Sequence, residues 1–271
     1  MSDEQAVVDH YGANYGHFGS DVYAEIRREA FGEEIGQNSW LTRGELEGFA
    51  ARLQLQASSR LLDIACGSGG PTLHLTRLTG CDSVGVDRHE EGIANANRAA
   101  HEADLQLRAR FVVADAAKPL QFDDASFDAI LCVDAVNHLP DRPRVFTDWA
   151  RLLRPGGRLL FTDPITVTGP LSGEEIAIRA SSRFFLFVPP GEDERLLAEA
   201  GLRVLAVEDA TDAMAEVAAR WGAARARRAD VVRQLEGDAT YEGQQRFLAT
   251  AATLARERRL SRLVYVADKP A

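Results

Sequence analysis

The stretch LLDIACGSGGP (Leu61–Pro71) decides the fold of this chain. Its apolar first half predicts a buried strand, and the glycines that follow predict a tight turn into a helix. Glycines at such a turn adopt positive φ and let a ligand approach the main chain closely. The acidic residue Asp63 precedes the turn, where its charge would repel a diphosphate but suits an ammonium group.

A dinucleotide-binding turn is the first alternative for this stretch. That fingerprint requires G-x-G-x-x-G, because its third glycine allows the helix to pack closely on the strand. Here Gly67 and Gly69 match the first two positions, but Thr72 occupies the third. A nicotinamide or flavin dinucleotide is therefore disfavoured.

Outward from this turn, strand-like and helix-like segments alternate. Near-continuous apolar runs predict strands at 60–65, 83–87, 110–115, 128–133 and 158–162. Helical patterns lie between them at 71–78, 90–102 and 142–153. This alternation predicts an α/β fold with a doubly wound sheet, in which ligands bind at the carboxyl ends of the strands.

The flanking segments follow a different pattern. Residues 1–57 read as a mostly helical lid, and residues 58–165 form the predicted core. Residues 166–190 read as a loop with an apolar patch. The C-terminal segment, 166–271, adds two strands near 202–207 and 263–266. Between those strands, two helical stretches that break near Gly237 predict a cap over the sheet edge.

Composition limits the classes of function. The chain has 271 residues, 45% of them hydrophobic, which is typical of a soluble globular protein. Its net charge of −10 disfavours broad contact with a nucleic-acid backbone. Three scattered cysteines fit neither a disulfide framework nor a metal site. The sequence lacks a signal-peptide pattern and a membrane-length apolar run, so we expect a cytoplasmic protein that does not enter a membrane.

The landmarks from 60 to 163 resemble a known family. The D-x-A-C-G-S-G-G turn resembles motif I of class I S-adenosylmethionine-dependent methyltransferases, and FDAILCVD (Phe127–Asp134) resembles motif IV. The turn LRPGG (Leu153–Gly157) resembles the one before strand five. The resemblance implies a Rossmann-like seven-stranded sheet in the order 3-2-1-4-5-7-6, with S-adenosylmethionine as cofactor.

The resemblance also implies where the cofactor binds. Asp87 matches the acid that binds both ribose hydroxyls, and Asp115 and Ala116 lie where the family contacts adenine. The predicted cofactor-binding residues are Tyr11, Gln37, Asp63, Ala65, Gly67, Gly69, Asp87, Arg88, Asp115, Ala116, Val133 and Asp134. Tyr11 and Gln37 belong to the lid segment that closes over the methionine end in related enzymes. A helix packed on the sheet, with Trp40 in the core, is the equal alternative.

Two residues are candidates for catalysis. His138, in the segment NHLPD, resembles the His-x-Pro-Asp segment of natural-product and quinone-type methyltransferases and would act as a general base. Asp163 ends strand five, where related O-methyltransferases place a catalytic carboxylate, and would orient His138. The alternatives are a hydrogen-bonding role for His138 and a capping role for Asp163, with Pro164 ending the strand.

The acceptor is predicted to be a small molecule. The sequence after strand four, Asp134-Ala-Val-Asn137, lacks the N-P-P-Y-like tetrad of enzymes that methylate DNA or protein glutamine. Aromatic residues in the cap, Phe184, Phe185, Phe187 and Trp221, favour an apolar or aromatic acceptor. O-methylation is expected before N- or C-methylation. A regulatory protein without catalysis and a cyclisation or rearrangement enzyme are the alternatives, and a homodimer is the working expectation.

Overall fold

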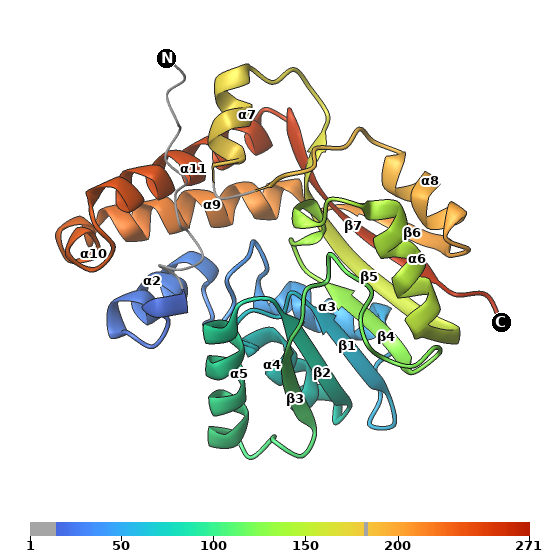
Figure 1. Ribbon diagram of the computed structural model, residues 1–271. Coiled ribbons are helices and arrows are strands. Elements are labelled where there is room, and N and C mark those ends of the chain that lie inside the picture. Colours follow the sequence, from blue (N-terminus) through green and yellow to red (C-terminus); the bar gives the residue numbers. More distant parts are fainter. Residues whose placement is uncertain (1–14, 182–183) are drawn as a thin grey trace.

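The computed structural model describes residues 15–181 and 184–271 (Figure 1). Its centre is a seven-stranded sheet in the order β3-β2-β1-β4-β5-β7-β6, which confirms the predicted order. The strands are β1 (Arg60–Ile64), β2 (Asp82–Asp87), β3 (Ala109–Val113), β4 (Phe127–Cys132), β5 (Leu153–Val167), β6 (Arg203–Asp209) and β7 (Leu260–Asp268). Strands β1 to β5 pair in parallel, whereas β7 runs antiparallel to β5 and β6.

Helices cover both faces of this sheet. On one face, α3 (Arg43–Arg52) and α4 (Gly70–Thr79) bury Phe49 and Leu75 against the strands. Next to them, α5 (Glu90–Glu102) packs Ala96 against Phe111. On the other face, α6 (Arg142–Leu152) and α8 (Glu192–Glu199) bury their apolar sides. The strands are apolar on both sides because both sides are covered.

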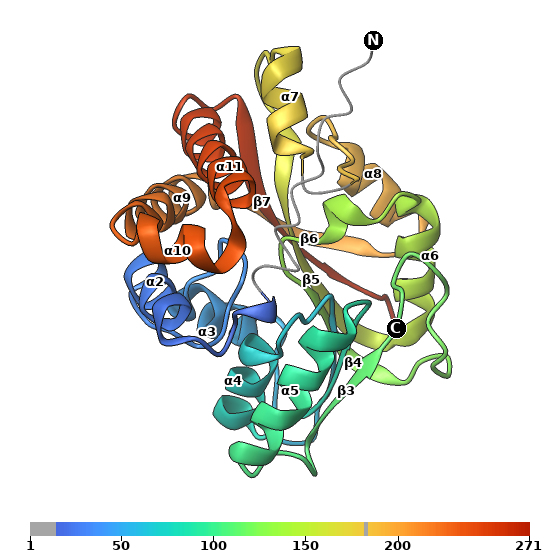
Figure 2. The same ribbon diagram turned by 60° about the vertical axis from the view of Figure 1, so that its left-hand side comes forward.

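A separate hydrophobic cluster packs a helix from the N-terminal part of the chain against three helices from its C-terminal part. It is formed by α2 (Asp21–Phe31), α9 (Thr211–Ala226), α10 (Ala229–Glu236) and α11 (Asp238–Arg256). Figures 1 and 2 show α9 and α11 side by side with α2 packed against α9. None of the described helices has the length and apolar run that a membrane crossing requires.

The structure differs from the sequence-based expectations in the C-terminal segment. Within the expected loop, Ser172 forms a capping box with Glu175 and starts a further helix, α7 (Gly173–Arg179). The cap holds three helices, because the chain also breaks between α9 and α10.

The expectation that Pro164 ends strand five is wrong. β5 continues to Val167, with a register shift against β7 between Asp163 and Thr166. The register shift interrupts the hydrogen-bonded pairing between β5 and β7 at Pro164. The proline, which has no N–H, therefore removes no hydrogen bond between these strands.

Candidate functional site

The glycine turn between β1 and α4 has the strained backbone that its sequence predicts. Ala65, Gly67 and Gly69 have φ values of 60°, 55° and 76°. A Cβ on Gly69 would lie 2.7 Å from the Cβ of Ala96 and 2.8 Å from the ring of Phe111. Glycine is therefore required here both by the backbone conformation and by the close approach of α5 and β3.

Asp87, the last residue of β2, holds this turn in place. Its two carboxylate oxygens accept hydrogen bonds from the N–H groups of Gly67 and His89, each at 2.9 Å. An ionised carboxylate offers about four acceptor positions. The side chain therefore orders the turn and keeps further acceptor capacity for a ligand.

A first cavity, here called the strand-end pocket, opens where β1 to β4 end. It has a volume of about 140 Å³. Seven of the residues predicted to bind the cofactor line it: Ala65, Asp87, Arg88, Asp115, Ala116, Val133 and Asp134. Tyr15, Val86, His89 and Leu139 complete its apolar and aromatic walls. The structure thus brings together residues from four strand ends, as expected for a doubly wound sheet.

Five predicted cofactor-binding residues lie elsewhere. Tyr11 lies outside the described residues. Gly67 and Gly69 build the turn beside the pocket without lining it. Gln37 is buried, and its side chain bonds the backbone of its own loop, at Ile35 N and Glu33 O.

Asp63, the fifth of these residues, is buried behind the glycine turn. The hydroxyl of Thr72 donates to its carboxylate at 2.5 Å. Burial, and to a lesser extent the nearby charge of Asp87, raises the pKa of Asp63 to about 7. Asp63 does not line the strand-end pocket, so contact between its carboxylate and an ammonium group stays a prediction.

A second cavity, here called the aromatic pocket, lies beside the first. Its walls include four rings, Trp40, Phe185, Trp221 and Phe247. Trp40 stacks on Phe247 with an interplanar angle of 13° and meets Trp221 edge to face. The buried guanidinium of Arg179 lies 4.3 Å from the centre of the Phe247 ring. Segments from the lid, β5 and the cap converge here, so the pocket offers flat apolar surface.

Three residues, Asn38, Asp134 and His138, line both pockets. Asp134 follows β4 and has a φ of 51°, which is uncommon for a residue with a side chain. Thr162 donates to the carboxylate at 2.6 Å and accepts from the Asp134 N–H at 2.7 Å. The strained backbone at the junction of the pockets is thus fixed by β5.

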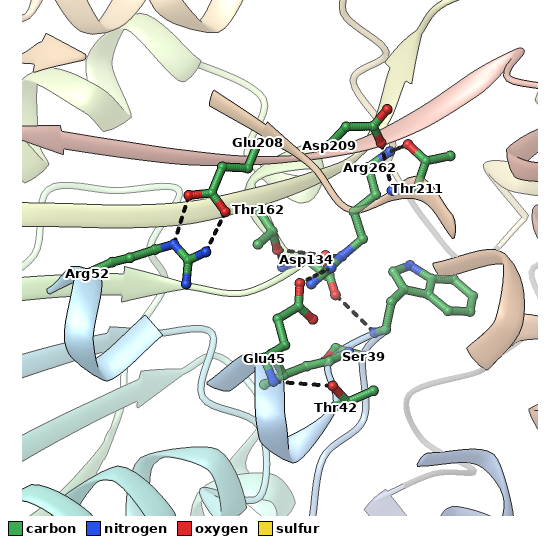
Figure 3. A network of polar contacts seen from close by, with 12 residues as sticks. Ser39, Thr42, Glu45, Arg52, Asp134, Thr162, Glu208, Asp209, Thr211 and Arg262 are labelled. Atoms are coloured by element: carbon green, nitrogen blue, oxygen red, sulfur yellow. Dashed lines mark hydrogen bonds and ion pairs between the residues drawn. The ribbon is translucent and has the colours of Figure 1, made fainter. Parts of the chain in front are cut away.

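A buried ion network continues from Asp134 (Figure 3). Arg262 of β7 donates to Asp134 at 2.7 Å and to Glu45 of α3 at 2.6 Å. The Trp40 N–H donates to the second oxygen of Asp134 at 2.9 Å. The two carboxylates raise the pKa of Arg262 above its usual range, although its burial opposes this. The network ties the lid loop to three elements of the core.

His138 sits in a short 3₁₀ helix, η1 (Val136–His138), directly after β4. Its ring meets Phe185 edge to face, with ring centres 4.6 Å apart. Its Nδ1 lies 3.0 Å from the carbonyl oxygen of Phe184. A carbonyl only accepts, so Nδ1 carries the hydrogen and Nε2 is the nitrogen with the lone pair. In the neutral ring, Nε2 is therefore the nitrogen that can take up a proton.

Asp163 does not face this junction, which corrects the expected placement in the cleft. Its side chain is 0% exposed and pairs with Arg142 at 2.7 Å, while Arg142 also pairs with Asp193 at 2.6 Å. Mainly burial and then the charge of Asp163 raise the pKa of Asp193 to about 7. Asp163 points toward α6 and α8, where its carboxylate pairs with Arg142.

The described residues hold no group of His, Cys, Asp and Glu side chains that is arranged for a metal ion. The three cysteines are buried and not paired with one another. Burial raises the pKa of the Cys66 and Cys132 thiols well above their usual range. These thiols are therefore unsuited to act as nucleophiles near neutral pH.

Sequence reasoning missed several residues of the two pockets. Asn38, Asn137, Arg179, Gln244 and Phe247 line the aromatic pocket, and Arg262 holds Asp134. One signal was available: an arginine at position 262 interrupts the apolar strand 260–267, and such a charge is buried only with a partner. The others come from loops and helix faces with no local signature.

Comparison with known proteins identifies the chain. A family model described as a methyltransferase domain matches residues 62–161. The chain is 33% identical to 27-O-demethylrifamycin SV methyltransferase of Amycolatopsis mediterranei, over 70% of this chain and 74% of that protein. It is 30% identical to methyltransferase GfsG of Streptomyces halstedii, over 65% and 66%.

Solved structures share the fold at lower identity. The cyclopropane synthase MmaA2 of Mycobacterium tuberculosis has a TM-score of 0.81 at 19% identity, covering 97% of this chain and 99% of that one. The [4+2]-cyclase SpnF has a TM-score of 0.78 at 22% identity, covering 98% and 97%. The identity to the Amycolatopsis mediterranei enzyme, together with the sheet order and the glycine turn, shows that the chain belongs to the class I S-adenosylmethionine-dependent methyltransferases.

Proposed function

We propose that this enzyme transfers the methyl group of S-adenosylmethionine to a hydroxyl oxygen of a small molecule with an apolar or aromatic body, and that His138 is the general base. The observation that carries the proposal is the position of His138. It lines both pockets, and in the neutral ring Nδ1 donates to the Phe184 carbonyl while Nε2 carries the lone pair.

The strand-end pocket fits the cofactor. Asp87 has spare acceptor capacity for the two ribose hydroxyls, and Ala116 and Leu139 offer apolar surface for a flat base. Asp115 lies at the end of β3, within reach of an amino group on that base. Tyr15 and Asn38 close the pocket from the lid side. When bound there, S-adenosylmethionine supplies a methyl group that its sulfonium already activates.

The protein's own contribution is then placement and proton removal. Holding the acceptor oxygen in line with the methyl group is worth about 7–11 kcal/mol in well-oriented reactions. Removal of the hydroxyl proton by a positioned base adds about 10²–10⁴-fold. The fixed junction at Asp134 and the aromatic walls exclude water and orient the acceptor. Asp163 has no part in the proposed mechanism, because its buried carboxylate is paired with Arg142.

Two observations support an oxygen acceptor. A hydroxyl must lose its proton during transfer, and an imidazole that can receive it lies at the junction of the pockets. The name of the relative from Amycolatopsis mediterranei, 27-O-demethylrifamycin SV methyltransferase, gives an oxygen as the methylation site. Other relatives are named sterol C-methyltransferases or phosphoethanolamine N-methyltransferases, so the proposal of an oxygen acceptor is supported by the base and not by the family.

The direct test is incubation of the enzyme with S-adenosylmethionine and 27-O-demethylrifamycin SV, together with a panel of hydroxylated aromatic and polyketide molecules. We expect an acceptor to gain the mass of one methylene while an equal amount of S-adenosylhomocysteine is released. Cofactor binding without transfer to any acceptor would contradict the proposal. Conversion of an acceptor without S-adenosylhomocysteine release would instead indicate cyclisation or rearrangement.

A further inference from the structure

Two buried side-chain amides in the aromatic pocket have their hydrogen-bonding capacity unused. Asn137 of η1 is 1% exposed, and Gln244 of α11 is 3% exposed. The Oδ1 of Asn137 and the Nε2 of Gln244 are fully buried without a partner among the described residues. Both residues line the aromatic pocket. Since about 90% or more of buried polar groups are hydrogen-bonded, two such amides in one cavity are unusual.

The wall of the pocket is mixed, with the rings of Trp40, Phe185 and Phe247 beside polar residues such as Asn38 and Arg179. None of the described residues bonds Asn137 Oδ1 or Gln244 Nε2. A buried amide without a partner costs about as much as a lost hydrogen bond, and a ligand that supplies the partner recovers that cost. The pairing is specific, because Gln244 Nε2 donates and Asn137 Oδ1 accepts. A matching ligand must therefore carry an acceptor and a donor.

We propose that Asn137 and Gln244 form a recognition subsite for an acceptor that carries a carbonyl and a hydroxyl group on an apolar body. Gln244 donates to the carbonyl oxygen, and Asn137 accepts from the hydroxyl. The proposal rests on the proposed function, since it concerns the acceptor side of the same enzyme.

The size of the cavity limits how much of the acceptor can bind inside it. The aromatic pocket has a volume of about 70 Å³. Pockets for drug-sized ligands span about 300–1,000 Å³. The subsite therefore takes one substituted ring or chain end, while the rest of a larger acceptor lies outside the cavity or displaces the Phe185 side of its wall.

Fragment binding tests this without turnover. The wild-type protein, saturated with S-adenosylhomocysteine, is titrated with meta-hydroxyacetophenone, acetophenone, meta-ethylphenol and meta-ethyltoluene, and binding is followed by NMR. We expect the first to bind about 10-fold or more tighter than the last, with the two single-group fragments between them, as for one or two net hydrogen bonds. Gln244→Met should abolish the preference for the carbonyl group, Asn137→Leu should abolish the preference for the hydroxyl group, and the double variant should bring the ratio close to one.

The stability of the variants separates recognition from structure. Replacing an amide that has no protein partner by an apolar side chain should leave the melting temperature unchanged or raise it. Gln245→Met is the matched control, because Gln245 donates to the Gly222 carbonyl at 3.1 Å and does not line the pocket. That variant should lose stability and keep the fragment preference.

Three results would overturn the subsite. They are equal binding of all four fragments to the wild type, an unchanged preference in Gln244→Met, and a structure in which the same ordered water bonds both amides with and without a fragment. None of them depends on methyl transfer. A failure of transfer with an intact fragment preference would overturn only the proposed function.

Discussion

The strand-end pocket and the aromatic pocket share three residues, but their remaining walls come from different parts of the chain. The strand-end pocket is built mostly from residues that directly follow β1 to β4, inside the segment 62–161 that matches the family model. The aromatic pocket takes Trp40 from the lid and Trp221, Gln244 and Phe247 from the cap.

The polar groups of the two pockets differ in whether they already have hydrogen-bond partners in the protein. Asp87 and Asp134 are held by backbone N–H groups, Thr162 and Arg262 before any ligand arrives. Asn137 and Gln244 have no such partners. The difference indicates that one pocket is preorganised for a fixed cofactor, whereas the other completes its hydrogen bonds with the acceptor. Each prediction below perturbs one side of this contrast and measures the other.

The largest effect is expected from Arg262→Met. The substitution leaves Asp134 and Glu45 as buried carboxylates without their shared cation, which typically costs about 3–5 kcal/mol of unfolding free energy. Because Asp134 fixes the Trp40 N–H, we also expect loss of the fragment preference in the aromatic pocket. Denaturant unfolding and fragment titration measure the two effects.

The control for this variant is Arg203→Met on the neighbouring strand β6. Arg203 pairs with Asp268 at the surface, where ion pairs contribute little. We expect no measurable loss of stability from it. If both arginine variants lose the same stability, the buried network does not hold the junction as described.

A smaller effect, confined to the strand-end pocket, is expected from Asp87→Asn. Hydrogen bonds to a charged group contribute about 1.5–3 kcal/mol, so affinity for S-adenosylhomocysteine should fall about 10–100-fold. Asp82→Asn, an exposed change at the start of the same strand, is the control and should bind normally. Calorimetry measures both. An equal loss in fragment binding would show that the two pockets are not separable.

The last expected change is a dependence of stability on pH. The pKa of Asp63 is raised from 3.8 to about 7 in the folded protein, so the folded state holds this proton more tightly than the unfolded state. Its contribution is therefore fully present below about pH 4 and is lost as the pH rises through about 7. The melting temperature of Asp63→Asn minus that of the wild type should be higher at pH 8 than at pH 5. A difference in melting temperature between the two proteins that does not change with pH would contradict this account.

The sequence predicted the core far better than the walls of the aromatic pocket. The apolar strands and the glycine turn are local patterns, and the family that they resemble implied the sheet order and the strand-end residues. The stacking of Trp40 on Phe247 joins segments that lie far apart in the chain, and no local pattern reports it. The sequence also did not reveal the direction of the Asp163 side chain. Side chains alternate along β5, and this alternation places Asp163 against Arg142 instead of beside His138.

The central claim is that His138 removes the acceptor proton at the junction of the two pockets. The most direct test is the rate of S-adenosylhomocysteine release with a methylated acceptor, compared between the wild type and His138→Gln. Glutamine can still donate to the Phe184 carbonyl but cannot act as a base at neutral pH. We predict a rate about 10²–10⁴-fold lower with unchanged cofactor affinity. A variant that transfers the methyl group at the wild-type rate would contradict the account.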